Sequence, residues 1–280
     1  MSAEYFAPTG LEEARALMQS RDLTIVAGGT DYYPALGQRP LTRDVMDVTR
    51  LAALKGLTWL DDGTLRIGAT TTWTEVVQAD LPPAFAGLQA AGREVGSVQI
   101  QNAATVAGNI CNASPAADGV PPLLTLDSSV EINGPEGERH VPLAAFLTGP
   151  RQTVLGPQDF VTALHVPPVE AATRSAFGKL GARKYLVISI AMCAALVRVR
   201  ADGTLAWARV AVGACSPVAV RLPALEAALV GQDVRAPQIA PEHLAPLDPI
   251  SDIRADAAYR RDAVRTLIAQ TVQEAGRAHG

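Results

Sequence analysis

Two loops of small residues, about eighty positions apart, constrain this chain more than any other feature. The first is residues 26–31 (VAGGTD) and the second is residues 105–118 (TVAGNICNASPAAD). Gly28 and Gly29 have no Cβ, so the backbone there can adopt a positive φ or lie directly against a ligand. Consecutive backbone N–H groups in such turns form a concave anion site that needs no lysine or arginine. Together the loops predict a ligand held from two sides, and a diphosphate suits that arrangement.

The composition is that of a globular chain. With 280 residues, 48% of them hydrophobic, it can bury a sizeable core and form more than one domain. The net charge of −4 and the lack of a basic block disfavour nucleic acid and anionic membranes as partners. We find neither an apolar run long enough for a membrane span nor a secretory signal pattern. Because Cys111, Cys193 and Cys215 are widely separated, as in a reducing compartment, we expect a soluble cytoplasmic protein.

Common catalytic and metal-binding motifs are missing from the sequence. The four histidines are scattered, and neither they nor the cysteines have the spacing of a metal or iron–sulfur site. The motifs G-x-S-x-G, G-x-x-x-x-G-K-S/T and G-x-G-x-x-G do not occur either, which removes the commonest hydrolase, nucleoside-triphosphatase and Rossmann interpretations. We therefore predict no metal ligands and no catalytic nucleophile or general base.

Local patterns predict alternating helices and strands. Capping boxes at Thr9-x-x-Glu12 and Thr72-x-x-Glu75 should each begin a helix. Pro167-Pro168 marks the expected boundary between two domains. Strands are expected at residues 23–27, 45–48, 59–60, 65–67, 130–132, 140–142, 160–166, 186–200 and 205–213. Further helices are expected at residues 83–95, 120–126, 221–230 and 257–275.

The two loops resemble the flavin-binding motifs of the FAD subunit of molybdenum hydroxylases, the medium-subunit type of xanthine dehydrogenase and carbon monoxide dehydrogenase. AGGTD and TVAGN-x-x-NASPAAD carry the resemblance. The segments IGATTTWTEV, VPLAAFLTGP, FGKLGARKYLVISIA and YRRDAVRTLI extend it over nearly the whole chain.

The resemblance implies an α+β fold in two parts. Residues 1–168 would form an FAD-binding domain of the PCMH or vanillyl-alcohol-oxidase-like type, with α/β subdomains at about 1–55 and 56–168. Residues 169–280 would form a smaller C-terminal α+β domain with an antiparallel sheet and helices.

The resemblance also implies roles for the first loop. The backbone of Gly28 and Gly29 would bind the FAD diphosphate, and Thr30 would add a hydroxyl hydrogen bond. Asp31 would be repelled by a diphosphate, so it should either face a hydroxyl group or cap a helix.

Further roles fall outside the first loop. Asp118 is assigned to a ribityl or ribose hydroxyl, with a helix N-cap as the alternative for both Asp118 and Ser114. Lys179 matches a position near the isoalloxazine, where a cation stabilises negative charge on the reduced ring, or else it is a solvated surface lysine. Val161 and Val95 align with positions against the flavin.

Two positions depart from the family pattern. Ala107 stands where a second glycine is usual, and Gln101 stands where arginine is frequent. The methyl group of Ala107 disfavours a positive φ, and we expect it to narrow the approach of the phosphate. The expected cofactor-binding residues are Ile25, Val26, Ala27, Gly28, Gly29, Thr30, Asp31, Tyr32, Thr105, Val106, Ala107, Gly108, Asn109, Ser114, Asp118, Val161 and Lys179.

The implied function is electron transfer through non-covalent FAD. A small partner subunit with two 2Fe–2S clusters would supply the electrons, and a large partner subunit with molybdopterin would oxidise the substrate. The acceptor would be NAD or a quinone. Two alternatives stay open: a self-sufficient oxidase or dehydrogenase of the vanillyl-alcohol-oxidase type, and a flavin-free scaffold subunit.

Overall fold

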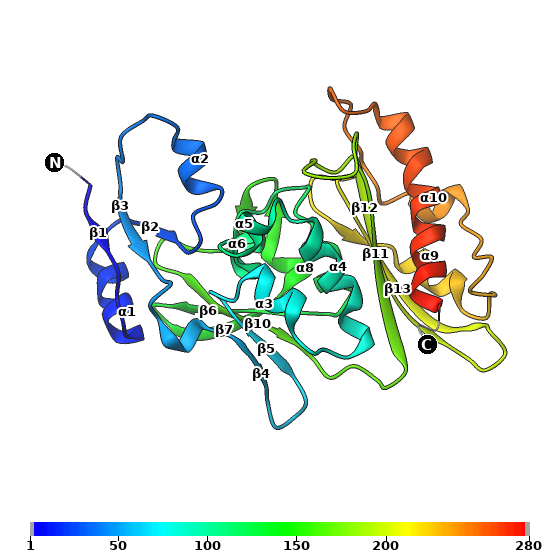
Figure 1. The fold of residues 1–280 in the computed structure, drawn as a ribbon, viewed down its shortest axis with the longest axis horizontal. Helices are drawn as coiled ribbons and strands as arrows, with labels where there is room; N and C mark the ends of the chain where they lie inside the picture. The colour runs from blue at the N-terminus through cyan, green and yellow to red at the C-terminus, as the bar shows by residue number, and fades with distance from the viewer. Residues whose placement is uncertain (1–2, 278–280) are drawn as a thin grey trace.

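The computed structural model describes residues 3–277, and the N-terminal part is a small parallel sheet with two helices (Figure 1). Strands β1 (Tyr5–Phe6), β3 (Asp44–Asp47) and β2 (Leu23–Val26) lie in that order, all parallel. Helix α1 (Leu11–Ser20) connects β1 to β2, and α2 (Tyr32–Leu36) follows the first glycine loop. This arrangement matches the α/β alternation expected for the first fifty residues.

The two capping-box predictions had different outcomes. The box at Thr72 and Glu75 is confirmed, because Thr72 accepts from the Glu75 N–H and the Glu75 carboxylate accepts from the Thr72 N–H. The box at Thr9 is wrong: α1 begins after Gly10, which is its N-cap and makes no side-chain bond. The Glu13 carboxylate, rather than that of Glu12, accepts from the Thr9 N–H at 3.0 Å.

The second subdomain is built on a five-stranded antiparallel sheet. Its strand order is β4 (Leu57–Trp59), β5 (Leu65–Gly68), β10 (Phe160–Val166), β6 (Ser129–Gly134) and β7 (Gly137–Pro142). A short hairpin of β8 (Leu147–Gly149) and β9 (Gln152–Thr153) lies beside it. The helical segments are η1 (Ala52–Leu54), α3 (Trp73–Gln78), η2 (Pro83–Phe85), α4 (Ala86–Glu94), α5 (Val98–Gln101), α6 (Val106–Cys111), α7 (Val120–Thr125) and α8 (Leu143–Phe146).

The C-terminal part is a four-stranded antiparallel sheet with a long helix. The strands run β11 (Thr173–Leu180), β12 (Ala191–Val199), β13 (Leu205–Gly213) and β14 (Val220–Arg221). Helices α9 (Pro223–Leu229), η3 (Pro241–Leu244) and α10 (Ala257–Gly276) follow. Strand β11 is absent from the sequence-based prediction, and the strand predicted to start at residue 186 starts at Ala191. Leu186 has φ of +51°, which an extended strand does not tolerate.

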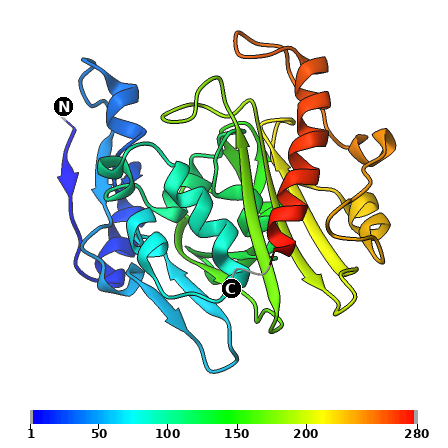
Figure 2. The same ribbon diagram turned by 45° about the vertical axis from the view of Figure 1, so that its right-hand side comes forward.

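The C-terminal sheet lies between helix α10 and the second subdomain. Helix α10 covers one face, and α4 and α7 of the second subdomain pack on the other (Figure 2). Leu196 on β12 and Ala211 on β13 accordingly share one hydrophobic core with the buried residues of the two N-terminal subdomains. A separate core joins the opposite face to α9 and α10 through residues such as Val264 and Ile268. The division at residue 168 stays a prediction.

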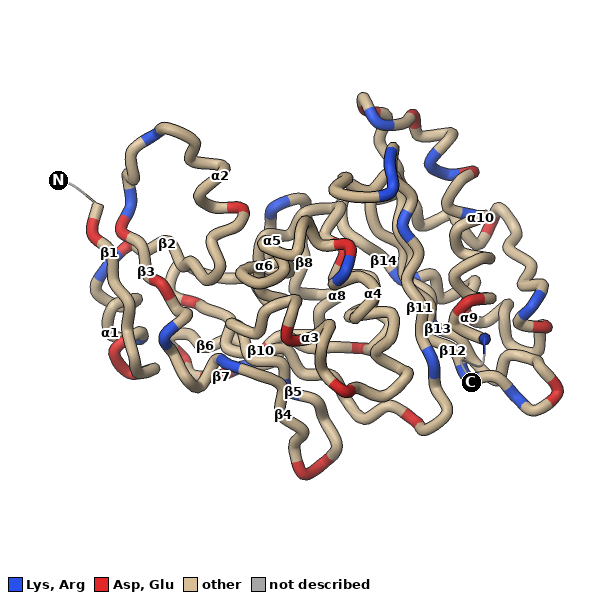
Figure 3. The backbone as a smooth tube through the Cα atoms, viewed as in Figure 1, with Lys and Arg blue, Asp and Glu red and all other residues tan. Residues whose placement is uncertain are grey.

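Charge is spread thinly over the molecule. Figure 3 shows acidic and basic residues interspersed along the chain, without a block of one sign. No helix within residues 3–277 is long and apolar enough to cross a membrane.

Candidate functional site

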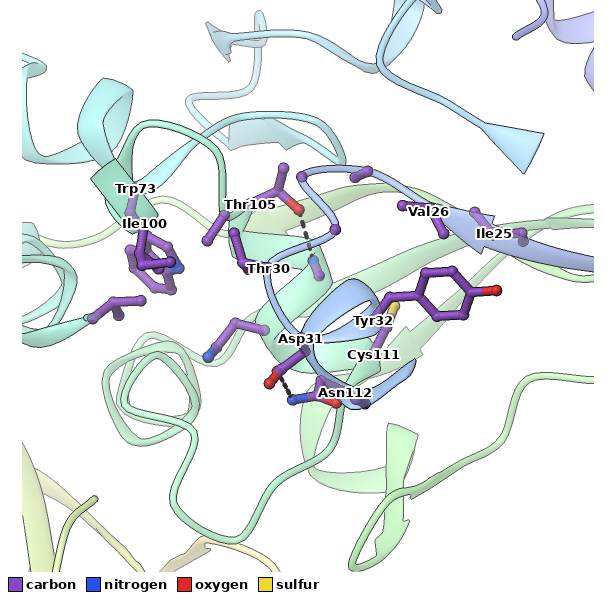
Figure 4. A pocket seen from close by; sticks show the side chains of 18 of the residues that line it. Ile25, Val26, Thr30, Asp31, Tyr32, Trp73, Ile100, Thr105, Cys111 and Asn112 are labelled. Atoms are coloured by element: carbon purple, nitrogen blue, oxygen red, sulfur yellow. Dashed lines mark hydrogen bonds between the residues drawn. The ribbon is translucent and has the colours of Figure 1, made fainter. Parts of the chain in front are cut away.

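A cleft of about 610 Å³ opens between the two N-terminal subdomains. Figure 4 shows Thr30, Asp31 and Tyr32 of the segment after β2 beside Thr105, Cys111 and Asn112 of the second loop. The volume is within the range of small-molecule and cofactor sites. The cleft brings together these residues of the predicted set: Ile25, Val26, Ala27, Gly28, Gly29, Thr30, Asp31, Tyr32, Thr105, Gly108 and Asn109.

The two glycines of the first loop are required by contacts within the chain. A Cβ on Gly28 would lie 1.8 Å from the carbonyl oxygen of Ala103, so this loop packs directly on the backbone that precedes the second loop. Gly29 has φ of +67°, and a Cβ there would lie 2.5 Å from the ring of Tyr33. The residue that Gly28 approaches closely is therefore part of the protein itself, namely the backbone of Ala103 just before the second loop. This contact sets the width of the cleft, while donation to a diphosphate stays a prediction.

The second loop begins α6 with a well-formed cap. Thr105 is the N-cap residue, and its Oγ1 accepts from the Gly108 N–H at 2.9 Å. The expected effect of Ala107 is wrong: its side chain is buried in the core and does not line the cleft, because the helix turns it inward. Val106 is buried in the same way. Only their backbone is available for the predicted cofactor contacts.

Asp31 makes a contact that neither sequence interpretation anticipated. It precedes α2, but its carboxylate makes no cap hydrogen bond, so the capping alternative is wrong. The carboxylate instead accepts from the side chain of Asn112, as Figure 4 shows, and Arg151 donates to the same amide. A chain of polar contacts therefore crosses the cleft between the subdomains.

Arg151 is the main residue that sequence reasoning missed. It directly follows the VPLAAFLTGP segment, its φ is +60°, and its N–H donates to Ala113 at 2.8 Å. Among the described residues that line the cleft, Arg151 is the one lysine or arginine. Val95, which the resemblance aligns with a position against the flavin, also lines the cleft. The other lining residues, which were not predicted to contact the cofactor, are Ala35, Trp73, Ile100, Ala104, Cys111 and Asn112.

Asp118 and Lys179 form a buried ion pair outside the cleft lining. The Lys179 Nζ lies 2.8 Å from Asp118 Oδ2, and the two side chains are 7% and 11% exposed. Ser189 Oγ donates to the other carboxylate oxygen at 3.1 Å. Burial raises the pKa of Asp118, and the Lys179 ammonium opposes that rise. The solvated-lysine alternative is therefore wrong, and the pair joins the second subdomain to β11.

The remaining predicted residues, Ser114 and Val161, make contacts within the protein. Ser114 Oγ accepts from the Ala116 N–H at 3.3 Å in a local turn, and α7 takes Gly119 as its N-cap, so the N-cap alternative is wrong for Ser114 and Asp118. Val161 lies on β10 in the core. Neither Ser114 nor Val161 lines the cleft, and their assignment to FAD stays a prediction.

Cys111 lies in the cleft but is not activated. Burial raises the pKa of its thiol to about 12, so it stays protonated at neutral pH. A protonated thiol is a poor nucleophile for attachment to a flavin.

Two histidines that are far apart in the sequence meet on the five-stranded sheet. His140 on β7 lies opposite Glu131 on β6, and His165 Nε2 lies 2.6 Å from the Glu131 carboxylate. The three side chains offer ligand atoms within 4.8 Å of one another. Arg66 and Thr162 also donate to this carboxylate, at 3.0 and 2.5 Å, and Arg66 already neutralises its charge. The cluster is therefore a charge-compensated network that ties β5, β6 and β10 together.

Replacing Glu131 by glutamine is expected to lower the free energy of unfolding at pH 7 by about 3 kcal/mol. Burial would raise the pKa of Glu131, but hydrogen bonds from Arg66, Thr162 and His165 outweigh it and lower the pKa to about 2, from 4.5. The stabilisation is therefore complete above about pH 5 and is lost as the pH falls toward about 2. Urea unfolding between these pH values measures it.

The exposed Glu138, 3.4 Å from His140, supplies the matched control for this experiment. Glu138→Gln should leave the pH dependence of stability unchanged. If Glu131→Gln and the unmodified chain lose stability in parallel on acidification, the proposed role of this network is wrong.

Comparisons with known proteins place this chain in a family. The sequence family described as FAD binding domain in molybdopterin dehydrogenase matches residues 1–169. The family described as CO dehydrogenase flavoprotein C-terminal domain matches residues 176–275. The chain belongs to the molybdopterin-dehydrogenase FAD-binding family, so the predicted family is confirmed.

Individual relatives extend over nearly the full length. The chain is 33% identical to the xanthine dehydrogenase FAD-binding subunit of Escherichia coli O157:H7, over 99% of this chain and 97% of the relative. It is 33% identical to the nicotinate dehydrogenase FAD-subunit of Eubacterium barkeri, over 81% and 79%. A chain of the Hydrogenophaga pseudoflava carbon monoxide dehydrogenase that lacks the Mo-pyranopterin moiety superposes with a TM-score of 0.87 and 28% identity, over 98% and 97%. The predicted fold and the class of FAD-dependent oxidoreductase subunit are confirmed.

Proposed function

We propose that this chain carries electrons through non-covalent FAD within a multi-subunit molybdenum hydroxylase. A small partner subunit supplies electrons from its 2Fe–2S clusters, and NAD or a quinone accepts them. A large partner subunit with molybdopterin oxidises and selects the substrate. The observation that carries the proposal is the cleft in which both predicted loops meet, in a chain of the molybdopterin-dehydrogenase family.

The cleft suits FAD in its volume and in the residues that line it. Bound FAD supplies the redox chemistry, and the protein holds and orients it. Both loops line the cleft, and Arg151 supplies a positive charge toward which a diphosphate is attracted. The chain's own cysteines do not provide a cluster site: the one group of three potential ligands within residues 3–277 is Glu131, His140 and His165. Iron–sulfur clusters would therefore come from a partner.

The purified chain is expected to bind FAD at about one equivalent and to release it on acid precipitation. The reason is that Cys111, in the cleft, is protonated and no other described cysteine lines it. Absorbance of the supernatant and pellet after precipitation measures the release. Flavin retained in the pellet would refute non-covalent binding, and a chain that never binds FAD would favour the scaffold alternative.

The partner set is tested by tagging the chain in its native genetic context. We expect co-purification of a small iron–sulfur subunit and a large molybdenum subunit, with substrate turnover only in the assembled complex. The isolated FAD-loaded chain should show no substrate-dependent flavin reduction under anaerobic conditions. If it emerges alone and reduces its flavin with an organic substrate of its own, the vanillyl-alcohol-oxidase type of function is correct instead.

A further inference from the structure

Polar and apolar side chains gather at different parts of the cleft. Figure 4 shows Trp73 and Ile100 at one side, Asp31 and Asn112 at the other, and Thr30 of the first loop between them. A diphosphate held by the two loops would therefore have an apolar surface on one side and a polar surface on the other. The isoalloxazine ring suits the apolar side, because cofactor pockets hold ring systems mostly against apolar side chains. The adenosine half of FAD is then left for the polar side.

Arg151 belongs to the polar side through its contacts with Asn112. Its Nη1 donates to the side-chain oxygen of Asn112 and, at 3.3 Å, to the backbone carbonyl of the same residue. The amide nitrogen of Asn112 in turn donates to the Asp31 carboxylate. Asn112 thus stands between two opposite charges, and it holds the guanidinium at the cleft without an ion pair to Asp31.

The guanidinium of Arg151 has N–H groups without a partner. Arginine carries five N–H groups, of which Nη1 supplies the two already described. The three on Nε and Nη2 have no acceptor among the residues that the structure describes. Arg151 is exposed and lines the cleft, so a ligand can reach its guanidinium.

The backbone at Arg151 is held in an unfavourable conformation. The angle φ is +60° at Arg151 and +47° at Ala113, and the Arg151 N–H donates to the Ala113 carbonyl at 2.8 Å. A positive φ in a non-glycine residue costs free energy and occurs often at ligand sites, where the surrounding structure maintains it. Arg151 stands in the turn between β8 and β9, where glycine would adopt this φ without strain. An arginine placed there at a cost points to a use for its side chain.

We propose that Arg151 binds the phosphate of the adenosine monophosphate half of FAD, and that this contact makes the cleft select FAD over FMN. The inference rests on the proposed function and assigns the selectivity to a residue outside both glycine loops. Nε and Nη2 form one edge of the guanidinium, and its parallel N–H groups bind two phosphate oxygens at once. FMN ends at the phosphate on its ribityl chain, so it offers nothing to this edge. Asn112 is then a positioning residue, because it holds Nη1 and leaves the edge free.

The first test compares ligands in Arg151→Met, which keeps an unbranched side chain and removes the donors. Calorimetric titration of the full chain, freed of flavin, is expected to show about 10- to 100-fold weaker binding of FAD, the size of lost charge-assisted hydrogen bonds. FMN should bind as it does to the unmodified chain. ADP should lose the same factor as FAD and adenosine should lose none, because adenosine has no phosphate. Arg235→Met, which breaks an exposed ion pair with Asp233 outside the cleft lining, is the matched control.

Arg151→Gly distinguishes this role from a structural one. Glycine relieves the strain of the positive φ, so without FAD the variant should need at least as much urea to unfold as the unmodified chain. Its affinity for FAD should nevertheless fall as in Arg151→Met. If Arg151 only supported the fold, this variant would be less stable and would lose affinity for FAD and FMN alike, which would overturn the inference.

The outcomes keep the two proposals apart. If Arg151→Met binds FAD with unchanged affinity, or loses affinity for FMN by the same factor, this inference is wrong while the proposed function stands. If adenosine is weakened as much as ADP, Arg151 contacts the adenosine moiety and the phosphate contact is wrong. If the unmodified chain binds neither FAD nor FMN, the proposed function is wrong and this inference with it.

Discussion

Gly28→Ala is expected to weaken FAD binding at least about 100-fold and to lower the free energy of unfolding by about 3 kcal/mol. The new Cβ would lie 1.8 Å from the carbonyl oxygen of Ala103 and 2.4 Å from its carbonyl carbon. Both atoms are backbone, so no side-chain rotation relieves the overlap. The two loops must separate, and the cleft between them widens. FAD titration and urea unfolding of the same preparation measure the two effects.

Gly10 provides the matched control, because a Cβ there meets nothing within 4 Å and its φ of −127° suits any residue. Gly10→Ala should bind FAD as the unmodified chain does and lose only about 0.5 kcal/mol, since alanine is a poor N-cap residue. A Gly28→Ala variant that behaves like Gly10→Ala would show that the loop contact does not shape the site.

Local signals in the sequence were sufficient for the first loop and for α3. A glycine at positive φ, such as Gly29, and a capping box, such as Thr72 with Glu75, are encoded within a few residues. The first capping box failed because Gly10 is itself an acceptable N-cap residue, and it took that position in place of Thr9. Local patterns thus located the helices. The residue at which a helix begins depended on which of two neighbouring residues took the N-cap position, as Thr9 and Gly10 show.

Strand β11 was missed for a different reason. Buried and exposed side chains do not alternate along this strand. Most of its side chains are half-buried, because α4, α10 and η2 cover the strand only in part. Arg174, Gly178 and Lys179 break the apolar run by which β12 and β13 were recognised. The strand is stabilised by pairing with β12 along its whole length, which is a non-local interaction.

The site residues also divide into those that local motifs identify and those that depend on distant contacts. Sequence reasoning brought Asp31 and the start of α6 to one ligand, but it could not find Arg151 or Trp73, whose places in the cleft depend on contacts with distant segments. It also treated Asp118 and Lys179 as separate contacts to FAD. They are 61 positions apart, and their pairing follows only from the packing of β11 on the second subdomain.

Asp118→Asn is expected to destabilise the chain by about 3 kcal/mol, because it leaves the buried Lys179 ammonium without a counter-charge. The amide has nearly the same shape as the carboxylate and can still accept from Ser189. Glu170→Gln, which breaks the exposed pair with Arg198, is the control and should cost under about 0.5 kcal/mol. Chemical denaturation without FAD measures both.

The double variant Asp118→Asn with Lys179→Met separates the structural role of this pair from its predicted contact with FAD. Removing both charges should restore most of the stability, because burial already disfavours the charged form of Asp118. If these residues contact FAD as predicted, affinity for the cofactor stays about tenfold or more below that of the unmodified chain despite the restored stability. Recovery of stability and affinity together would instead show that the pair only joins the second subdomain to β11.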